Sequence, residues 1–139
     1  MFLNNIKSVA IFGASGAIGE AFMAQLAEYE NIQHIYTFSR KKMAVQSPKI
    51  KHSFFDFNDP NTIASAVQNI HEDTPIELCL VTSGILHTDT IQPEKSIKQV
   101  DLESLQTIFN ANTFGPMLIA KHIAPYLKKG SPNVFAALS

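Results

Sequence analysis

Three glycines at regular spacing follow a short apolar run near the start of the chain, and this arrangement is suited to binding a phosphate group. The run from Val9 to Phe12 is β-branched and aromatic, as in buried strands, and a helical pattern begins after Gly13, Gly16 and Gly19. Glycines there let backbone N–H groups approach a pyrophosphate, and the N-terminus of the following helix adds a partial positive charge. The order of strand, turn and helix therefore predicts a nucleotide-binding turn.

The glycine spacing also has a second interpretation. It reads Gly-x-x-Gly-x-x-Gly, whereas the common Rossmann pattern is Gly-x-Gly-x-x-Gly. A turn of this composition could serve only to pack a helix closely against a sheet. The elements that follow must therefore support the nucleotide-binding interpretation.

Length and composition limit the classes of protein to consider. The chain has 139 residues, 45% of them hydrophobic, and a formal net charge of -1, which fits a single domain over residues 1–139. The longest basic run is Arg40-Lys41-Lys42, so we expect no nucleic-acid partner, and no apolar stretch is long enough to predict a membrane span. The lone Cys79 lies in an apolar run, which predicts a buried, inert thiol and is consistent with a cytoplasmic protein.

Apolar runs of strand type alternate with amphipathic helical patterns along the whole chain. Such alternation predicts an α/β fold, a doubly wound and mostly parallel sheet of the Rossmann type. A strand at the very end, where such sheets ordinarily continue, indicates that the fold is truncated after about the fifth strand and that the chain is the N-terminal part of a longer protein. The expected strands are residues 9–12, 34–38, 51–55, 76–81 and 133–138, and the expected helices are residues 18–29, 59–70 and 101–129.

The glycine turn and the order of elements after it resemble the short-chain dehydrogenase/reductase family, over the whole chain. That family commonly carries Thr-Gly-x-x-x-Gly-x-Gly at this turn; here Phe12 replaces the threonine and Ala17 the middle glycine. The resemblance implies a nicotinamide cofactor along the turn, with Ser15 donating a hydrogen bond to phosphate. The cofactor-binding residues expected here are Gly13, Ser15, Gly16, Ala17, Ile18 and Gly19.

Ser39 and Arg40 follow the second expected strand, where an NAD-dependent enzyme usually carries an acidic residue for the ribose hydroxyls. A guanidinium can bind the 2′-phosphate of NADP in bidentate fashion, so this position favours NADP over NAD. A solvated basic loop is the alternative, and it suits Lys41 and Lys42 better than Arg40.

Two further segments match cofactor contacts of the family. Asp56 corresponds to an aspartate near the adenine amino group, and Phe57 could contact the ring, although Asp56 could equally order its own loop. Thr82-Ser83-Gly84 stands where relatives carry Asn-x-Ala-Gly, and its small residues suit a strand end that admits a cofactor. A tight turn would select the same small residues.

Asn112 falls where the family places a helix-kinking asparagine that supports a proton-relay water. Pro116 has no N–H to donate to the Asn112 carbonyl, which predicts a kink with a free acceptor, although both residues could simply shape packing. Ser139 falls at or one position before the catalytic serine of the family, or is an ordinary serine at a strand end.

The Tyr-x-x-x-Lys pair of the family, its acid/base group and the lysine that tunes it, is missing. Tyr126 is followed by Lys128 and Lys129 at the wrong spacing, so we expect the Tyr126 side chain to pack against its neighbours or to lie on the surface. The five histidines are scattered without the spacing of metal ligands, and we predict no metal site.

The resemblance implies an NADP-dependent oxidoreductase that reduces a small-molecule carbonyl or oxidises an alcohol by hydride transfer, inactive in the chain as given. It also implies assembly of copies through the long helix at residues 101–129. The alternatives are a non-catalytic NADPH-binding regulator or sensor and an extended family member such as a sugar-nucleotide epimerase or dehydratase, the last suggested only by the glycine spacing.

Overall fold

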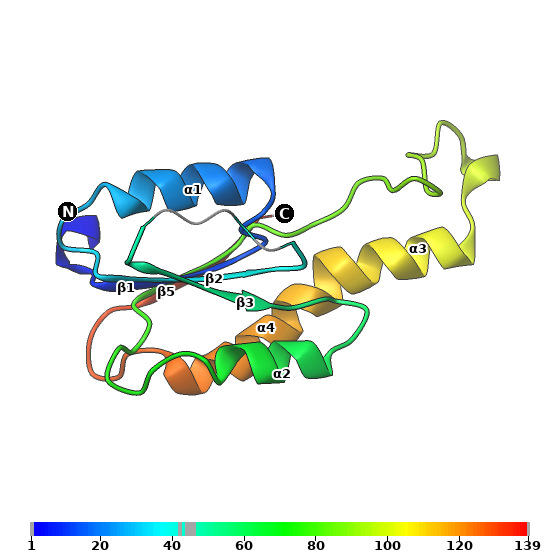
Figure 1. Cartoon of the computed structure of the whole chain (residues 1–139). Helices are drawn as coiled ribbons and strands as arrows, with labels where there is room; N and C mark the ends of the chain where they lie inside the picture. Colours follow the sequence, from blue (N-terminus) through cyan, green and yellow to red (C-terminus); the bar gives the residue numbers. More distant parts are fainter. Residues whose placement is uncertain (1, 42, 44–46, 139) are drawn as a thin grey trace.

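The computed structural model describes residues 2–41, 43 and 47–138, and it contains a parallel five-stranded sheet (Figure 1). The strand order is β3-β2-β1-β4-β5, and every neighbouring pair is parallel. This order confirms the predicted doubly wound fold, because the chain starts in the middle and winds toward both edges. The strands are β1 (Ser8–Phe12), β2 (His34–Ser39), β3 (Ile50–Phe54), β4 (Leu78–Val81) and β5 (Val134–Ala137).

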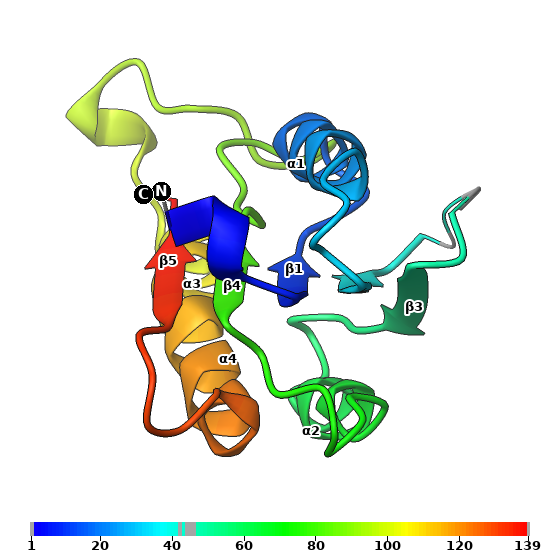
Figure 2. The ribbon, with the colours of Figure 1, turned by 90° about the vertical axis from the view of Figure 1, so that its left-hand side faces the viewer.

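Helices cover the two faces of the sheet unequally (Figure 2). The helix α1 (Ala17–Ala27) lies on one face, while α2 (Asn61–Val67) and α4 (Gly115–Ile123) lie on the other. The helix α3 (Leu102–Phe109) leads into α4 through a π-helical turn at Asn110–Phe114. No helix among the described residues is both long and apolar enough to cross a membrane.

Alternate residues of the strands supply two apolar layers. In β1, Val9 and Ile11 face α1, whereas Ala10 and Phe12 face α2 and α4, and all four are fully buried. The Phe12 ring stacks on Phe38 of β2, with 4.2 Å between centroids. Because β1 is central and buried on both faces, it is apolar throughout, as parallel strands usually are.

Several expected boundaries change in the structure. The fourth strand begins at Leu78 rather than at residue 76, the second helix covers only residues 61–67, and the long helix is divided by the π turn and ends in a 3-10 turn at Ala124–Tyr126. The helical spacing of Ile18, Phe22, Leu26 and Tyr29 in the sequence predicts one buried stripe on α1. Ile18 is nevertheless 52% exposed, because it lies in the first turn of α1, at the carboxyl edge of the sheet. The periodicity of apolar residues is a local signal, whereas the residues at which a helix or strand begins and ends depend on tertiary contacts.

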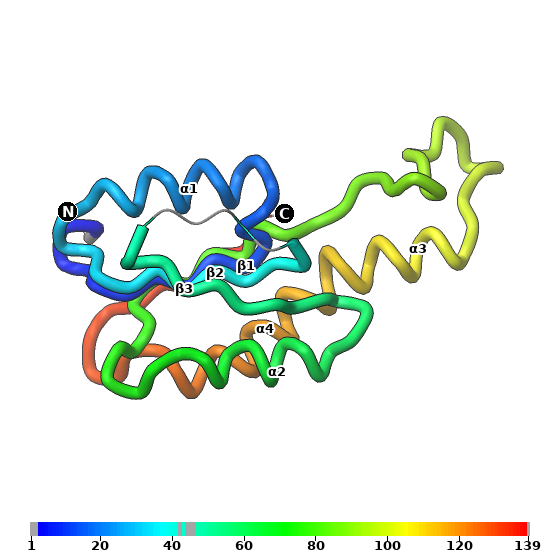
Figure 3. The backbone as a smooth tube through the Cα atoms, in the orientation of Figure 1, coloured from blue at the N-terminus to red at the C-terminus, as the bar shows by residue number. Residues whose placement is uncertain are grey.

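The long segment between β4 and α3 departs furthest from the sheet. In Figure 3 the tube runs away from the layered core after β4, turns, and returns along α3. Asp101 begins α3 as an N-cap, its carboxylate accepting hydrogen bonds from the N–H and hydroxyl of Ser104, and these bonds lower the pKa of Asp101. The predicted helix start near residue 101 is thus confirmed.

A buried carboxylate joins the amino ends of the central strands. Glu77, just before β4, is 5% exposed and accepts hydrogen bonds from the backbone N–H groups of Lys7 and Ser8 at the start of β1. The ammonium of Lys128, in the segment leading to β5, lies 2.5 Å from the same carboxylate. Burial raises the pKa of Glu77, but Lys128 and the two N–H groups together outweigh burial and lower it.

The substitution Glu77→Gln tests this link. We expect the free energy of unfolding at pH 7 to fall by about 1–3 kcal/mol, because the ion pair is lost while Lys128 is half exposed and can rehydrate. A lowered pKa in the folded state gives wild-type stability that is complete above the ordinary value of 4.5 and lost as pH falls through the lowered pKa. Urea unfolding between pH 7 and 3 should show this acid loss in wild type and in the exposed control Glu72→Gln, but a flatter profile in Glu77→Gln. Equal acid profiles for Glu77→Gln and wild type would contradict the assignment.

Candidate functional site

The glycine turn joins the carboxyl ends of three strands. Gly13 directly follows β1 and has a φ of 84°, a conformation that favours glycine. Its N–H donates to the Phe38 carbonyl of β2 at 2.9 Å, and a Cβ on Gly13 would lie 2.5 Å from the backbone nitrogen of Ser83 beyond β4. No side chain fits between these strand ends, so the turn lies in close contact with both neighbours.

The start of α1 leaves backbone donors available to an anion. Gly16 is the N-cap residue and supplies no side-chain cap, although its carbonyl accepts from the Glu20 N–H at 2.8 Å. Gly19 lies so close to the turn that a Cβ there would overlap the Gly13 carbonyl. Gly16, Ala17 and Ile18 are exposed. Uncapped N–H groups at an exposed helix N-terminus favour a phosphate.

The residues expected to read the ribose lie beside this turn. The Ser39 hydroxyl donates to the Lys41 carbonyl at 2.8 Å, which orders the loop that leaves β2. Arg40 is exposed and lies two residues beyond Phe38, whose carbonyl holds Gly13. The structure therefore brings Arg40 near the turn; Lys42 lies outside the described residues.

Asp56 and Phe57 follow β3 at the same edge of the sheet. The Asp56 carboxylate accepts from the Asn58 N–H at 3.0 Å, and the Asp56 N–H donates to the Thr62 hydroxyl at 2.9 Å. The Phe57 ring packs edge-on against Phe55, with 5.0 Å between centroids, and lies where a Cβ on Gly115 would be. Asp56 thus orders its loop, and Phe57 packs against the start of α4.

The end of β4 is attached to β1 by Thr82. Its N–H and hydroxyl both donate to the Phe12 carbonyl, at 2.8 and 2.9 Å. The Ser83 hydroxyl is buried and has no hydrogen-bond partner within the part of the chain that the structure describes. Gly84 faces Asn112, and a Cβ on Gly84 would lie 3.1 Å from the Asn112 Oδ1, a tight contact that requires a small shift of the Asn112 side chain.

Asn112 holds the segment after β4 through its side chain. Its Oδ1 accepts from the Ile85 N–H at 2.8 Å, and its Nδ2 donates to the Ile85 carbonyl at 2.7 Å. Asn112 lies within the π-helical turn, which ends directly before Gly115 and Pro116. The kink expected from Pro116 is therefore a π turn. Its hydrogen bonds join residues five apart rather than four, so the helix adapts to the backbone N–H that Pro116 lacks.

Two contacts of the site were not foreseen from the sequence. Ile85 takes part only through its backbone, for which residue type gives no signal. The contact of Gly115 with Phe57 has a weak signal in the Gly-Pro dipeptide at residues 115–116. Ser139 lies outside the described residues, so its predicted role is untested.

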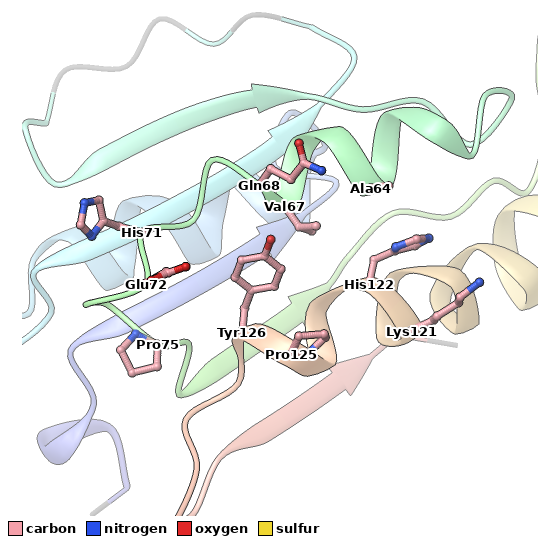
Figure 4. Close-up of a pocket in the computed structure, with 10 residues that line it drawn as sticks. All are labelled: Ala64, Val67, Gln68, His71, Glu72, Pro75, Lys121, His122, Pro125 and Tyr126. Carbon is pink, nitrogen blue, oxygen red and sulfur yellow. The ribbon is translucent and has the colours of Figure 1, made fainter.

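A separate cavity of about 570 Å³ opens between α2 and α4 (Figure 4). Side chains from the end of α2, from the segment that follows it and from α4 with its final 3-10 turn surround the cavity, and Tyr126 projects between them. The Tyr126 carbonyl accepts from the Ile76 N–H before β4, so this cavity lies toward the amino ends of the strands. It includes none of the expected cofactor-binding residues; its polar lining is Gln68, His71, Glu72, Lys121, His122 and Tyr126.

Among the residues that the structure describes, no group of three His, Cys, Asp or Glu side chains is placed to hold a metal ion. Burial raises the pKa of Cys79 to about 12, so this thiol in β4 stays protonated near neutral pH.

The fold and this edge of the sheet agree with a known family. The family model described as short chain dehydrogenase matches residues 7–134, nearly the whole chain. The chain therefore belongs to the short-chain dehydrogenase family. No curated protein matches the sequence significantly.

Solved structures show the same fold at low sequence identity. NADPH-bound carbonyl reductase from chicken fatty liver is 20% identical with a TM-score of 0.74, over 87% of this chain and 48% of that one. Aldohexose dehydrogenase from Thermoplasma acidophilum is 20% identical with a TM-score of 0.71, over 89% and 45%. Serine dehydrogenase from Escherichia coli is 12% identical with a TM-score of 0.71, over 85% and 55%. The chain thus spans about half the length of these proteins.

The contact of Asn112 with Ile85 can be tested with a graded pair of substitutions. Asn112→Leu removes both hydrogen bonds and should lower the free energy of unfolding by about 1–2 kcal/mol, because these bonds are exposed and water can replace them. Asn112→Asp keeps the acceptor for the Ile85 N–H but sets a carboxylate against the Ile85 carbonyl. Hydrogen exchange at the Ile85 amide should be fastest in Asn112→Leu and intermediate in Asn112→Asp. Equal exchange in all three proteins would show that the contact does not hold this segment.

Proposed function

We propose that this chain is the cofactor-binding part of an NADP-dependent short-chain oxidoreductase that reduces a carbonyl or oxidises an alcohol. The observation that carries the proposal is the fit of Gly13 between β2 and β4, which puts an uncapped helix N-terminus at the carboxyl edge of the sheet. That cradle would be filled by any side chain, and it suits a pyrophosphate. A nicotinamide dinucleotide bound there supplies the hydride chemistry.

The residues at this edge would divide the binding between them. Ser15 and the backbone from Gly16 to Ile18 would hold the pyrophosphate, and Thr82, Ser83 and Gly84 would leave space for the cofactor. Asp56 and Phe57 would border the adenine pocket. These roles follow from the family resemblance and are supported by the meeting of the segments at one edge.

The preference for NADP over NAD is proposed from the positive charge of the residues beside the glycine turn. Exposed Arg40 and Lys41 follow β2 where an acidic residue would select NAD, and the bond from Ser39 to Lys41 orders their loop. A structural neighbour binds NADPH, which is consistent with this preference.

Catalysis would need groups in addition to those described. The Asn112 backbone carbonyl would support a proton-relay water, since Pro116 cannot donate to it, while its side chain positions Ile85. Ser139 would bond the substrate carbonyl. None of the three tyrosines is followed four residues later by lysine, so the chain as given should bind cofactor without turning over substrate. The second candidate, a non-catalytic NADPH-binding regulator, would need no such pair.

The proposal also covers the substrate of the protein, its self-assembly and its cellular compartment. The substrate would be a small molecule, and copies would assemble through residues 101–129, where large apolar side chains remain exposed: Leu102 at 70%, Phe109 at 51% and Met117 at 70%. We place the protein in the cytoplasm, consistent with one buried, reduced thiol.

The cofactor proposal is tested by titration calorimetry with NADPH and NADH. Arg40→Gln should weaken NADPH binding about tenfold and leave NADH binding nearly unchanged, because only the 2′-phosphate contacts the guanidinium. Lys41→Gln is the matched control and should change NADPH affinity less than Arg40→Gln. Equal loss for both nucleotides would contradict the assignment of Arg40, and absence of binding to either would contradict the proposed function.

The two candidate functions differ in the protein that contains this chain. Extending the coding sequence beyond Ser139 and assaying carbonyl reduction distinguishes them. Turnover dependent on a downstream Tyr-x-x-x-Lys supports the oxidoreductase, whereas stoichiometric NADPH binding by a protein ending at Ser139 supports the regulator.

A further inference from the structure

Four phenylalanine rings form a continuous row on the face of the sheet that carries α2 and α4. Phe38 of β2 stacks on Phe12 of β1, and Phe12 meets Phe55 edge-on, with 5.4 Å between centroids. Phe55 in turn meets Phe57 edge-on at 5.0 Å. The first three rings are at most 3% exposed, so they form a closely packed support for the half-buried ring of Phe57.

The last ring of this row lies against the π-helical turn that contains Asn112. The Gly115 N–H donates to the carbonyl of Asn110, five residues earlier, which is the hydrogen bond that defines a π turn. A Cβ on Gly115 would overlap the Phe57 ring, which supplies its three closest atoms. The ring therefore fills the place of the side chain that Gly115 lacks, at the residue where the hydrogen-bonding pattern of the helix changes.

The loop that carries Phe57 also borders the proposed adenine pocket. Asp56, the residue before it, is expected beside the adenine amino group. Its N–H donates to the Thr62 hydroxyl of α2 at 2.9 Å, and its carbonyl lies 3.0 Å from the same hydroxyl. Phe57 thus belongs to the pocket through its backbone and contacts the π turn through its ring.

We propose that Phe57 is a positioning residue, through which a ligand in the adenine pocket restricts the motion of the π turn and of Asn112. The inference rests on the proposed function, because it requires adenine to bind beside Asp56 and Phe57. A ligand that orders the backbone at these two residues also orders the ring, and the ring contacts Gly115, three residues after Asn112. Asn112 then keeps its two hydrogen bonds to Ile85 for a larger fraction of the time. Two sites are coupled in this way by ordering alone, without a change in the average structure.

This coupling would connect the two ends of the proposed cofactor site. The Asn112 carbonyl is the group proposed to support the relay water, and the adenine pocket lies at the other end of the dinucleotide. The geometry of the relay would therefore be best defined when cofactor is bound.

Hydrogen exchange at the Ile85 amide, measured on the chain of 139 residues, tests the contact itself. Gly115→Ala should speed this exchange about tenfold, because the added methyl group and the Phe57 ring cannot occupy the same space. Adding Phe57→Ala should reverse most of the increase, since the methyl group then fits where the ring was. Adding Phe54→Ala instead is the matched control and should reverse nothing, because Phe54 is a 55% exposed phenylalanine outside the row. Unchanged exchange in Gly115→Ala, or a double variant with Phe57→Ala as fast as Gly115→Ala alone, would overturn the proposal.

Adenosine 2′,5′-bisphosphate tests the coupling to the adenine pocket, because it contains the adenine end of NADP without the nicotinamide. At saturating concentration, established by titration calorimetry, it should slow exchange at the Ile85 amide about threefold or more in wild type and in Phe54→Ala. Phe57→Leu keeps an apolar side chain beside Phe55 but no longer reaches Gly115, so this variant should bind the ligand more weakly and show no slowing. Gly115→Ala keeps every proposed binding residue and should likewise bind the ligand without slowing.

The outcomes separate this inference from the proposed function. Binding to wild type without slowing at Ile85, or equal slowing in wild type and Phe57→Leu, would overturn the inference and leave the cofactor site intact. Absence of binding to wild type would contradict the proposed function, and the inference would fail with it. Circular dichroism checks the fold of each variant. Loss of the fold in Phe57→Leu would also overturn the inference, because Phe57 would then support the whole structure rather than the π turn.

Discussion

The backbone hydrogen bond from the Gly13 N–H to the Phe38 carbonyl is the constraint on which the proposed site depends. It fixes the first turn against the end of β2, while the backbone of Ser83 occupies the space on the other side. With both sides closed, the chain after β1 must turn at a residue without a side chain and enter α1 at the edge of the sheet. The direction of α1, and so of its free N–H groups, follows from this narrow space rather than from any charged residue.

Different interactions stabilise the two ends of the central strands: neutral hydrogen bonds at the carboxyl end and a buried ion pair at the amino end. At the carboxyl end, neutral backbone bonds and the hydroxyl of Thr82 join the strands, and the stacked rings of Phe12 and Phe38 fill the layer beneath. At the amino end, the buried carboxylate of Glu77 gathers two backbone donors and an ammonium. The group that titrates is thus separated by the length of β1 from the turn expected to bind phosphate. Protonation of Glu77 at low pH should therefore weaken the amino ends of β1 and β4 before it affects the hydrogen bonds around the Gly13 turn.

The sequence was sufficient for the alternation of strands and helices, for the doubly wound fold class and for the glycine turn, because periodicity and glycine spacing are local signals. It was insufficient for contacts between distant segments. The bonds of Asn112 to Ile85 join residues 27 positions apart through a backbone partner that carries no residue signature. Pro116 indicated an irregular helix, but the choice of a π turn depends on packing around it. Helical periodicity placed Ile18 on a buried stripe, yet the first turn of α1 faces the open edge of the sheet.

The same contact between Asn112 and Ile85 has a consequence for how the chain could vary. It closes a loop of residues 86–111, in which residues 86–101 extend away from the core before α3 returns to it (Figure 3). Once the base of a loop is closed by hydrogen bonds, each doubling of its length adds only about 0.6 kcal/mol of closure entropy. Insertions and deletions in the excursion would therefore leave the sheet and the glycine turn almost undisturbed. In evolutionary terms, this segment is free to diversify while the scaffold beneath it stays fixed.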